Sequence, residues 1–321
     1  MNEEKINLLA KKIADAKTIL IFGHKNPDGD ALSAALGLRF LIADSLDKKA
    51  DVIYDGNLPF KYDFIPGRGD MMYAGKMPAK KYDLAISLDS PSIKQIGAAQ
   101  LSFFNSARDT VKIDHHKTGE NDDYANLNIH AGDFVATAEI IYEIAKSANW
   151  KISANAANCL YAGIYTDTGG FNYIDNGNAL RVAASLVDLG ADARAILPNI
   201  NMCTRWDIAA QGQALANAEF FYGGALAIAE IPNKSYKKLD SGETALVMCL
   251  RNVKGVKVLA VLKEAKSSEI YVSLRSETVV VRSVAEKLGG GGHDFAAAVN
   301  LNMNLQSAKE TIIEAFAGIN C

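Results

Sequence analysis

The chain has 321 residues, 49% of them hydrophobic and 22% charged, a composition typical of a globular protein with about two domains. Its 34 Lys and Arg residues against 37 Asp and Glu residues give a net charge of -3, so the chain lacks the basic excess of proteins that bind long nucleic acids. We therefore expect that any nucleic-acid substrate is short.

Short apolar runs alternate with helical patterns along the first half of the chain. The expected strands are residues 18–22, 51–54, 83–88 and 110–113. The expected helices are residues 6–13, 32–41, 93–101, 136–148 and 156–164. This alternation predicts an α/β domain in which helices flank a mainly parallel sheet.

The second half of the chain reads as a smaller α+β domain. An irregular stretch near Pro198 suggests a junction, so we predict domains at residues 1–190 and 213–321 with a linker at 191–212. The expected strands, spaced as an antiparallel set, are residues 225–231, 244–250, 257–262 and 269–274. The expected helices are residues 283–288 and 305–316.

The cysteines and apolar runs predict a cytoplasmic protein without membrane contacts. Cys159, Cys203, Cys249 and Cys321 form no C-x-x-C pair, so neither a disulfide framework nor a thiolate zinc site is expected. No apolar run approaches the roughly 18 residues that cross a membrane, and the N-terminus lacks an export signal.

Three predicted strands of the first domain end in side chains that bind metals. The first strand runs into His24, the third into Asp89, and the fourth into Asp114, His115 and His116. Because the carboxyl ends of parallel strands meet at one edge of a sheet, we expect these side chains to converge.

The loop from His24 to Asp30 adds two carboxylates to this edge. Asp28 and Asp30 lie two residues apart, so in an extended loop they project the same way and each can bind a different ion of a close pair. The alternative for Asp30 is that it caps the helix that follows. That alternative leaves His24 and Asp28 unexplained.

His115 and His116 are adjacent, and adjacent side chains of an extended chain point to opposite faces. We therefore expect one of them to bind a metal ion and the other to contact substrate. The alternative, a hydrogen-bonded core or surface histidine, is the commoner fate of an isolated His. The Asp-His-His run at a strand end favours the functional interpretation.

Asp167 follows an apolar helical stretch and is the fourth candidate carboxylate, although a simple turn is the alternative. If Asp28, Asp30, Asp89 and Asp167 converge, their negative charges require compensation. Two divalent cations would cancel them. Hard carboxylate ligands suit Mg²⁺ or Mn²⁺, and the imidazoles favour Mn²⁺, with Co²⁺ as another alternative. Such a pair activates water against a phosphoryl group, which predicts phosphoester hydrolysis.

The second domain carries a second set of candidates, suited to binding an anion. They are Ser273, Arg275 and Ser276 at a strand end, and Gly290, Gly291, Gly292 and His293 after a helix. Arg can grip a phosphate with two parallel hydrogen bonds, and glycines let main-chain N–H groups approach an anion. The alternatives are an exposed strand end for the arginine and a flexible turn for the glycines.

Taken together, these motifs occur in one order along nearly the whole chain: the histidine and two aspartates of the first loop, the single aspartate, the Asp-His-His run, the fourth carboxylate and the glycine-histidine signature. In this the chain resembles the DHH/DHHA1 phosphoesterases, and within them the ribonucleases of short oligonucleotides that also dephosphorylate 3'-phosphoadenosine 5'-phosphate. The resemblance implies an N-terminal DHH domain, a C-terminal DHHA1 domain, and an active site in the cleft between them.

The resemblance also implies roles for the residues. His24, Asp28 and Asp89 would hold one Mn²⁺. The second Mn²⁺ would be held by Asp30, Asp89, His115 and Asp167, with Asp89 as the bridge. Asp114 would support the ligands without binding a metal ion itself, and His116 would face the scissile phosphate. Arg275 and the glycine loop with His293 would bind the nucleotide, so cleavage would need closure of the two domains.

Three stretches of the chain depart from the family pattern. Glu277 stands where a lysine is common, and Asp294 and Phe295 stand where a basic residue is common, so positive charge is lost near the expected substrate. Val135, Ala136 and Thr137 replace a hydroxyl-rich run. The metal ligands themselves are all present.

We therefore predict a Mn²⁺-dependent phosphoesterase, possessing the catalytic residues Asp89, Asp114 and His116, that hydrolyses very short RNA, such as pApA or pGpG, and converts 3'-phosphoadenosine 5'-phosphate to AMP. Within the enzyme class the main alternative is a cyclic-dinucleotide phosphodiesterase, followed by a pyrophosphatase or exopolyphosphatase. From another class, the alternative is a nucleotide sensor without catalysis. The family resemblance also suggests a homodimer.

Overall fold

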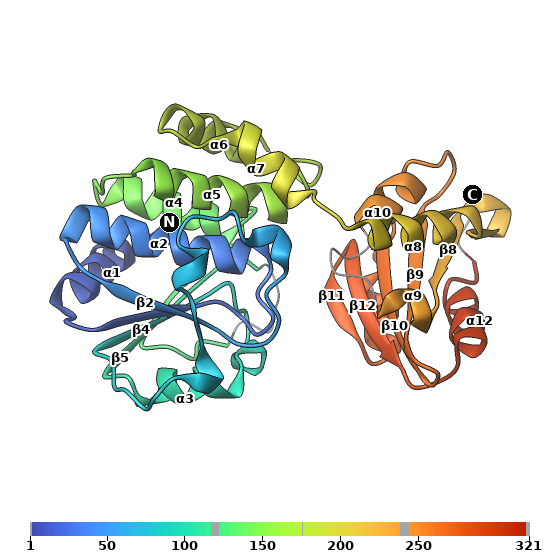
Figure 1. Cartoon of the computed structure of the whole chain (residues 1–321), viewed down its shortest axis with the longest axis horizontal. Helices are drawn as coiled ribbons and strands as arrows, with labels where there is room; N and C mark the ends of the chain where they lie inside the picture. The colour runs from blue at the N-terminus through green and yellow to red at the C-terminus, as the bar shows by residue number, and fades with distance from the viewer. Residues whose placement is uncertain (1, 117–121, 175, 238–243, 319–321) are drawn as a thin grey trace. The chain divides into compact units, whose positions relative to one another are not determined.

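The computed structural model describes residues 2–116, 122–174, 176–237 and 244–318, apart from the side chains of Thr244, Ala245 and His293. Cys321 lies outside these ranges. The chain forms two compact units that divide between residues 200 and 201 (Figure 1). Among the described helices, none is both long and apolar enough to span a membrane.

The first unit is built on a six-stranded parallel sheet with the order β3-β2-β1-β4-β5-β6. Its strands are β1 (Ile19–Phe22), β2 (Ala50–Tyr54), β3 (Met72–Tyr73), β4 (Leu84–Leu88), β5 (Asp109–Asp114) and β6 (Leu127–His130). The order reverses direction between β1 and β4. In open α/β sheets, ligands bind beyond the carboxyl ends of the strands at such a reversal.

Helices cover both faces of this sheet, as the sequence predicts. Figure 1 shows α2, α4 and α5 on one face and α3 on the other. The helices are α1 (Glu3–Asp15), α2 (Gly29–Leu46), α3 (Ala98–Ser106), α4 (Thr137–Ser147), α5 (Ala154–Asp167), α6 (Asn178–Asp188) and α7 (Ala193–Ile200). Short 3-10 turns are η1 (Phe60–Tyr62), η2 (Arg68–Asp70), η3 (Ala74–Lys76) and η4 (Ile93–Gln95).

The strands of the central sheet consist of apolar residues because both of their faces are covered. All residues of β1 and β4 are buried. Leu36 of α2 and Ile86 of β4 belong to the larger core on one face, whereas Phe22 and Phe104 pack edge to face in a smaller core on the other. The helix expected at residues 93–101 is instead the 3-10 turn η4 followed by α3.

The second unit contains a six-stranded mixed sheet with the order β11-β12-β10-β9-β8-β7. Its strands are β7 (Glu219–Phe221), β8 (Leu226–Ile231), β9 (Val258–Lys266), β10 (Glu269–Ser276), β11 (Gly291–His293) and β12 (Ala296–Leu301), and η5 (Tyr222–Gly224) links the first two. The helices are α8 (Arg205–Ala216), α9 (Asn233–Tyr236), α10 (Thr244–Arg251), α11 (Arg282–Lys287) and α12 (Leu305–Ala315).

Two expectations for this unit are wrong. Residues 244–251 form the helix α10 and not a strand, and β8 pairs with β9 in parallel, so the strands are not a purely antiparallel set. The two differences have one cause, because parallel neighbours need a crossover connection and α10 supplies it. A short apolar run does not distinguish a buried helix from a buried strand by its periodicity. The predicted architecture of an α/β domain and a smaller α+β domain is confirmed.

The core of the first unit provides a test of the packing. Leu36 is fully buried in α2, whereas Leu180 of α6 is 47% exposed. We expect Leu36→Ala to lower the free energy of unfolding by about 2–5 kcal/mol, because it removes buried methyl groups and leaves a cavity. Leu180→Ala, the matched control, should change it by about 0.5 kcal/mol or less. Urea denaturation followed by circular dichroism measures both, and equal effects of the two variants would contradict the described core.

Candidate metal centre

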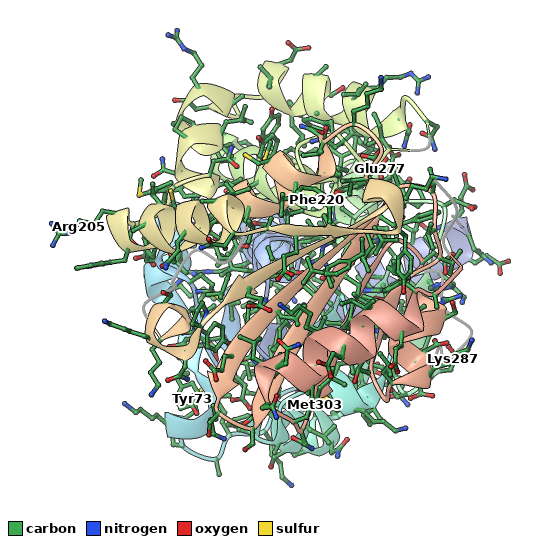
Figure 2. The ribbon with its side chains drawn as sticks, turned by 90° about the vertical axis from the view of Figure 1, so that its right-hand side faces the viewer. Tyr73, Arg205, Phe220, Glu277, Lys287 and Met303 are labelled. Carbon is green, nitrogen blue, oxygen red and sulfur yellow. The ribbon has the colours of Figure 1, made fainter. Side chains whose placement is uncertain are left out.

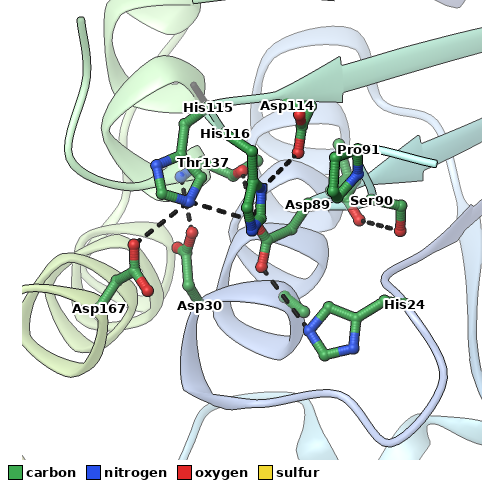
Figure 3. Close-up of polar contacts among 12 residues, drawn as sticks. His24, Asp30, Asp89, Ser90, Pro91, Asp114, His115, His116, Thr137 and Asp167 are labelled. Atoms are coloured by element: carbon green, nitrogen blue, oxygen red, sulfur yellow. Dashed lines mark hydrogen bonds and ion pairs between the residues drawn. The ribbon is translucent and has the colours of Figure 1, made fainter. Parts of the chain in front are cut away.

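The predicted ligand residues lie together beyond the carboxyl ends of the parallel strands (Figure 3). His24 follows β1, Asp89 follows β4, and Asp114 ends β5 before His115 and His116. Asp28 and Asp30 lie at the start of α2, and Asp167 is the last residue of α5. Residues separated by more than 100 positions in the sequence thus meet at one edge of the sheet.

Asp89 lies at the centre of this cluster. One of its oxygens, Oδ2, is 3.9 Å from Nε2 of His24. The other, Oδ1, is 3.4 Å from Nε2 of His115 and 3.7 Å from Nδ1 of His116. Its side chain is 3% exposed, so protein atoms surround it on nearly every side. The two oxygens of this carboxylate therefore face different sets of partners.

The first loop divides its two carboxylates between two tasks. Asp28 is the N-cap of α2, because its side chain accepts hydrogen bonds from the backbone N–H groups of Asp30 and Ala31, both at 3.0 Å. Asp30, which the capping alternative assigned to this role, instead accepts from Thr137 N at 2.6 Å and Ala138 N at 3.0 Å. Asp30 therefore caps the first turn of α4 and not that of its own helix.

The rings of His115 and His116 lie side by side, with centroids 4.6 Å apart, and both face Asp89. The expectation of opposite faces is wrong because β5 ends at Asp114, so the two histidines are not in an extended strand. His115 Nδ1 lies 3.3 Å from the Phe134 carbonyl, which leaves Nε2 3.2 Å from Asp167 Oδ2. A carbonyl at Nδ1 fixes the tautomer that offers Nε2 to a cation.

Asp114 orients the second histidine. Its Oδ1 lies 2.8 Å from Nδ1 of His116, and the Asp114 side chain is fully buried. Its other oxygen, Oδ2, is buried and makes no hydrogen bond within the described residues. This arrangement turns the remaining ring nitrogen of His116, Nε2, away from Asp114.

The pKa values of the cluster are shifted because several buried carboxylates lie close together. Burial and the charges of neighbouring aspartates raise the pKa of Asp30 and of Asp167 well above the usual range. Burial and the charge of Asp28 likewise raise the pKa of Asp89. Burial opposes the charged form of His24, but its contacts with Asp28 and Asp89 outweigh this and raise its pKa to about 9. Positive charge is thus favourable at the centre of the cluster. Ionised carboxylates are unfavourable there unless a positive charge lies beside them.

Three groups of side chains in the cluster have ligand atoms within 4.8 Å of one another: His24, Asp28 and Asp89; Asp30, His115 and Asp167; and Asp89, His115 and His116. Carboxylate oxygens with imidazole nitrogens are suitable ligands for a hard divalent cation such as Mn²⁺. The donor set therefore fits a pair of cations. Asp89 belongs both to the group with His24 and Asp28 and to the group with His115 and His116.

Thr137, at the first turn of α4, contacts two of the candidate ligands and is a candidate site residue that the sequence alone does not reveal. Its hydroxyl donates a 3.0 Å hydrogen bond to Asp89 Oδ1, while its backbone N–H binds Asp30. The side chain is fully buried. Residues 135–137 depart from the family pattern, but only the fold brings Thr137 to Asp89. Thr137 thus holds the Asp89 carboxylate, which faces two groups of candidate ligands.

Comparison with known proteins agrees with this geometry. The model of the DHH family N-terminal domain matches residues 18–164, and that of the DHHA1 domain matches residues 224–318. The chain belongs to the DHH family. The resemblance inferred from the motifs is thereby confirmed, and the two units contain the DHH and DHHA1 domains of a phosphoesterase.

Relatives of this DHH protein match it over nearly the whole length. The bifunctional oligoribonuclease and PAP phosphatase NrnA of Mycoplasma genitalium is 31% identical, over 92% of this chain and 92% of that protein. The NrnA of Thermus thermophilus is 29% identical, over 97% of this chain and 93% of that protein. The crystal structure of an exopolyphosphatase-related protein from Bacteroides fragilis superposes with a TM-score of 0.89 and 25% identity, covering 98% of this chain and 96% of that one.

The predicted anion-binding residues of the DHHA1 domain do not all have free side chains. Ser273 Oγ accepts a 3.0 Å hydrogen bond from the buried Lys263, and Arg275 donates to the Leu274 carbonyl at 2.9 Å. The strand β10 places Ser273 and Arg275 on one face. Ser276 is on the other face, and its hydroxyl accepts from Thr278 N and Val279 N while donating to the Lys257 carbonyl. Ser276 therefore holds a turn, and its expected contact with the substrate stays a prediction.

The glycine run is more ordered than a flexible turn. Gly291 and Gly292 belong to β11, which pairs with β12. The N–H of Gly290 donates to the Ala285 carbonyl at 2.7 Å and so is not directed at an anion. A Cβ at Gly290 would lie 2.2 Å from the Ala298 carbonyl oxygen, which explains the need for glycine there. The side chain of His293 lies outside the described part of the structure.

The acidic departures from the family pattern have partners within this domain. Arg251 Nε lies 3.3 Å from a carboxylate oxygen of Glu277, a residue labelled in Figure 2. Arg282 lies 2.9 Å from Asp294. The negative charges that replace the expected basic residues are thus partly neutralised by neighbouring arginines.

Thr137 provides a test of how the cluster is held. We expect Thr137→Val, which has nearly the same shape, to weaken Mn²⁺ binding about 10–100-fold, because residues that orient a ligand commonly have effects of that size. Isothermal titration calorimetry measures the affinity. The matched control is Thr311→Val, since the Thr311 hydroxyl donates within α12 of the other unit. Equal Mn²⁺ affinities for the two variants would show that the hydroxyl does not position Asp89.

Proposed function

We propose that this DHH phosphoesterase hydrolyses short oligoribonucleotides and removes the 3'-phosphate of 3'-phosphoadenosine 5'-phosphate, using a pair of Mn²⁺ ions. The observation that carries the proposal is Asp89, whose two oxygens face separate groups of ligand atoms. The names of the relatives that match nearly the full chain, which describe an oligoribonuclease and PAP phosphatase, support the substrate class.

The proposed ligands divide between two ions. His24, Asp28 and Asp89 would hold the first. Asp30, Asp89, His115 and Asp167 would hold the second, and the donor atoms of each set other than the shared Asp89 already lie within 4.8 Å of one another. The mixture of imidazoles and carboxylates favours Mn²⁺ over Mg²⁺, and Co²⁺ is also suited to it.

A bound cation pair polarises a phosphoryl oxygen and lowers the pKa of water. The protein's own residues supply the rest of the reaction. Asp114 holds Nδ1 of His116 at 2.8 Å. Hydrogen bonding to Asp114 and the charge of Asp89 outweigh burial and raise the pKa of His116. We assign to His116 the delivery of a proton from Nε2 to the oxygen that leaves phosphorus.

The DHHA1 domain would recognise the substrate's phosphate. Arg275 lies on the same face of the sheet as Ser273 and carries a guanidinium that suits a phosphate group. The net charge of -3 argues against the extended electrostatic contact that a long polymer requires. The expected position of the active site between the two domains, the homodimer and the cytoplasmic location stay predictions.

Asp89→Asn tests the bridge. The amide is nearly isosteric but lacks the negative charge, so the variant should fold normally and lose several kcal/mol of transition-state stabilisation, which corresponds to a fall in kcat of at least about 100-fold. The control is Asp188→Asn at the exposed end of α6. Turnover of pApA at saturating Mn²⁺ measures both variants. Activity of Asp89→Asn near that of the control would remove Asp89 as the bridge.

A panel of substrates tests the substrate class. The purified protein is incubated with Mn²⁺ and, separately, with pApA, 3'-phosphoadenosine 5'-phosphate, a cyclic dinucleotide and pyrophosphate, and the products are separated by chromatography. We expect mononucleotides from pApA and AMP from 3'-phosphoadenosine 5'-phosphate. Faster turnover of the cyclic dinucleotide or of pyrophosphate would reassign the substrate. Binding of all four without hydrolysis would identify a sensor.

A further inference from the structure

The turn that carries Asp89 has an unusual backbone. Asp89 has a φ of 54°, in the left-handed region that residues other than glycine rarely adopt. Such a conformation costs roughly 1–3 kcal/mol and persists only where surrounding contacts fix it. The backbone N–H of Asp89 donates to the Ile113 carbonyl at 2.9 Å, which fixes the start of the turn. The position of the carboxylate then depends on what holds the residues that follow.

A buried polar cluster lies under this turn, within an otherwise apolar layer. Ser87 of β4 and Lys112 of β5 are paired in register, and their side chains are 0% and 1% exposed on the face that packs against Phe104. Apolar residues normally fill such positions, because burial of an ammonium group is costly unless hydrogen bonds compensate it. The presence of lysine here therefore calls for a specific reason.

The cluster directs its donors at the turn. Lys112 Nζ donates to the Pro91 carbonyl at 2.8 Å and to the Asp122 carbonyl at 3.2 Å. Its ammonium lies 5.0 Å from the centroid of the Tyr124 ring. The hydroxyl of Tyr124 donates to the Ser90 carbonyl at 3.0 Å. Figure 3 shows Ser90 and Pro91 next to Asp89.

Each of the two residues after Asp89 is thus held through its carbonyl, one by Tyr124 and the other by Lys112. Ser87 completes the set, since its hydroxyl lies 3.0 Å from that of Tyr124. None of these three side chains is among the proposed metal ligands. Their influence on the metal centre therefore passes through the backbone of the turn.

We propose that Lys112 and Tyr124 are positioning residues, which fix the strained turn so that the Asp89 carboxylate presents one oxygen to each cation. This inference rests on the proposed function, because it concerns the cation pair of that same site. Without the two donors, the Ser90 carbonyl loses its hydrogen bond from Tyr124, and the Pro91 carbonyl keeps only the longer one from Asp122 N at 3.3 Å. The backbone at Asp89 then relaxes from the left-handed region, and the carboxylate leaves its bridging position.

The test compares Lys112→Met with the wild type. Methionine keeps much of the apolar stem but removes the charge and the donors. Lys80→Met is a matched control, because the Lys80 ammonium also lies over a tyrosine ring, 4.6 Å from the Tyr82 centroid, but is paired with Asp51. Mn²⁺ affinity is measured by isothermal titration calorimetry, the coupling of the two ions by electron paramagnetic resonance, and kcat and KM with pApA.

We expect Lys112→Met to bind at least one Mn²⁺ about 10–100-fold more weakly, as is usual for residues that orient ligands. The spectrum of an exchange-coupled Mn²⁺ pair should give way to that of separate ions. At saturating Mn²⁺, kcat should fall at least about tenfold with little change in KM, since the bridge and not substrate binding is disturbed. Lys80→Met should behave as the wild type. A general loss of stability would not change the spectrum of the folded protein.

Wild-type Mn²⁺ affinity and a coupled spectrum for folded Lys112→Met would overturn the inference. If that variant does not fold, Tyr124→Phe decides, because it removes one hydroxyl and keeps the ring. We expect it to weaken Mn²⁺ binding about tenfold, and wild-type affinity and spectrum would again refute the role. If wild-type protein binds two Mn²⁺ but cleaves no substrate, the proposed function fails, whereas the metal measurements still test Lys112 and Tyr124.

Discussion

The crowding of carboxylates around Asp89 is the constraint on which the rest of the structure depends. Asp28 and Asp30 approach it from the start of α2, and Asp167 approaches it from the end of α5. Burial makes the charged form of Asp30, Asp89 and Asp167 unfavourable unless cations are present. The fold relieves part of this repulsion with its own dipoles, since the first turn of α4 offers two backbone N–H groups to Asp30. The divalent cations proposed for this centre would compensate the remaining negative charge.

The two units have different kinds of polar sites because their sheets differ. The parallel sheet of the first unit directs all of its strand ends to one edge, so ligands from β1, β4 and β5 meet at a point. The mixed sheet of the second unit instead offers a face, on which β10 places Ser273 and Arg275 two residues apart. A point at which several ligand side chains meet suits the binding of small ions.

Polar residues within the apolar layers support the centre at a distance. Lys112 and Ser87 occupy buried positions where apolar side chains would avoid the free-energy cost of burying a polar group. Thr137 places a hydroxyl at a fully buried helix start. Thr137 donates to Asp89 itself, and Lys112 donates to the turn that carries Asp89. Ser87 contacts the hydroxyl of Tyr124, which also donates to that turn. Precise placement of Asp89 is a physical reason to retain such residues, since backbone carbonyls and carboxylates need directed donors to stay in one position.

The sequence by itself determined the parallel sheet, the family and the residues that gather at the strand ends, because strand periodicity is local and parallel strands share one carboxyl edge. Tertiary structure decided how these residues are oriented. Asp28 and not Asp30 caps α2, because Asp30 finds its donors in α4, which begins more than 100 residues later. The same applies to α10, whose apolar run became a helix because β8 and β9 are parallel and need a crossover. Local sequence patterns do not predict hydrogen-bond or strand partners that lie far apart in the chain.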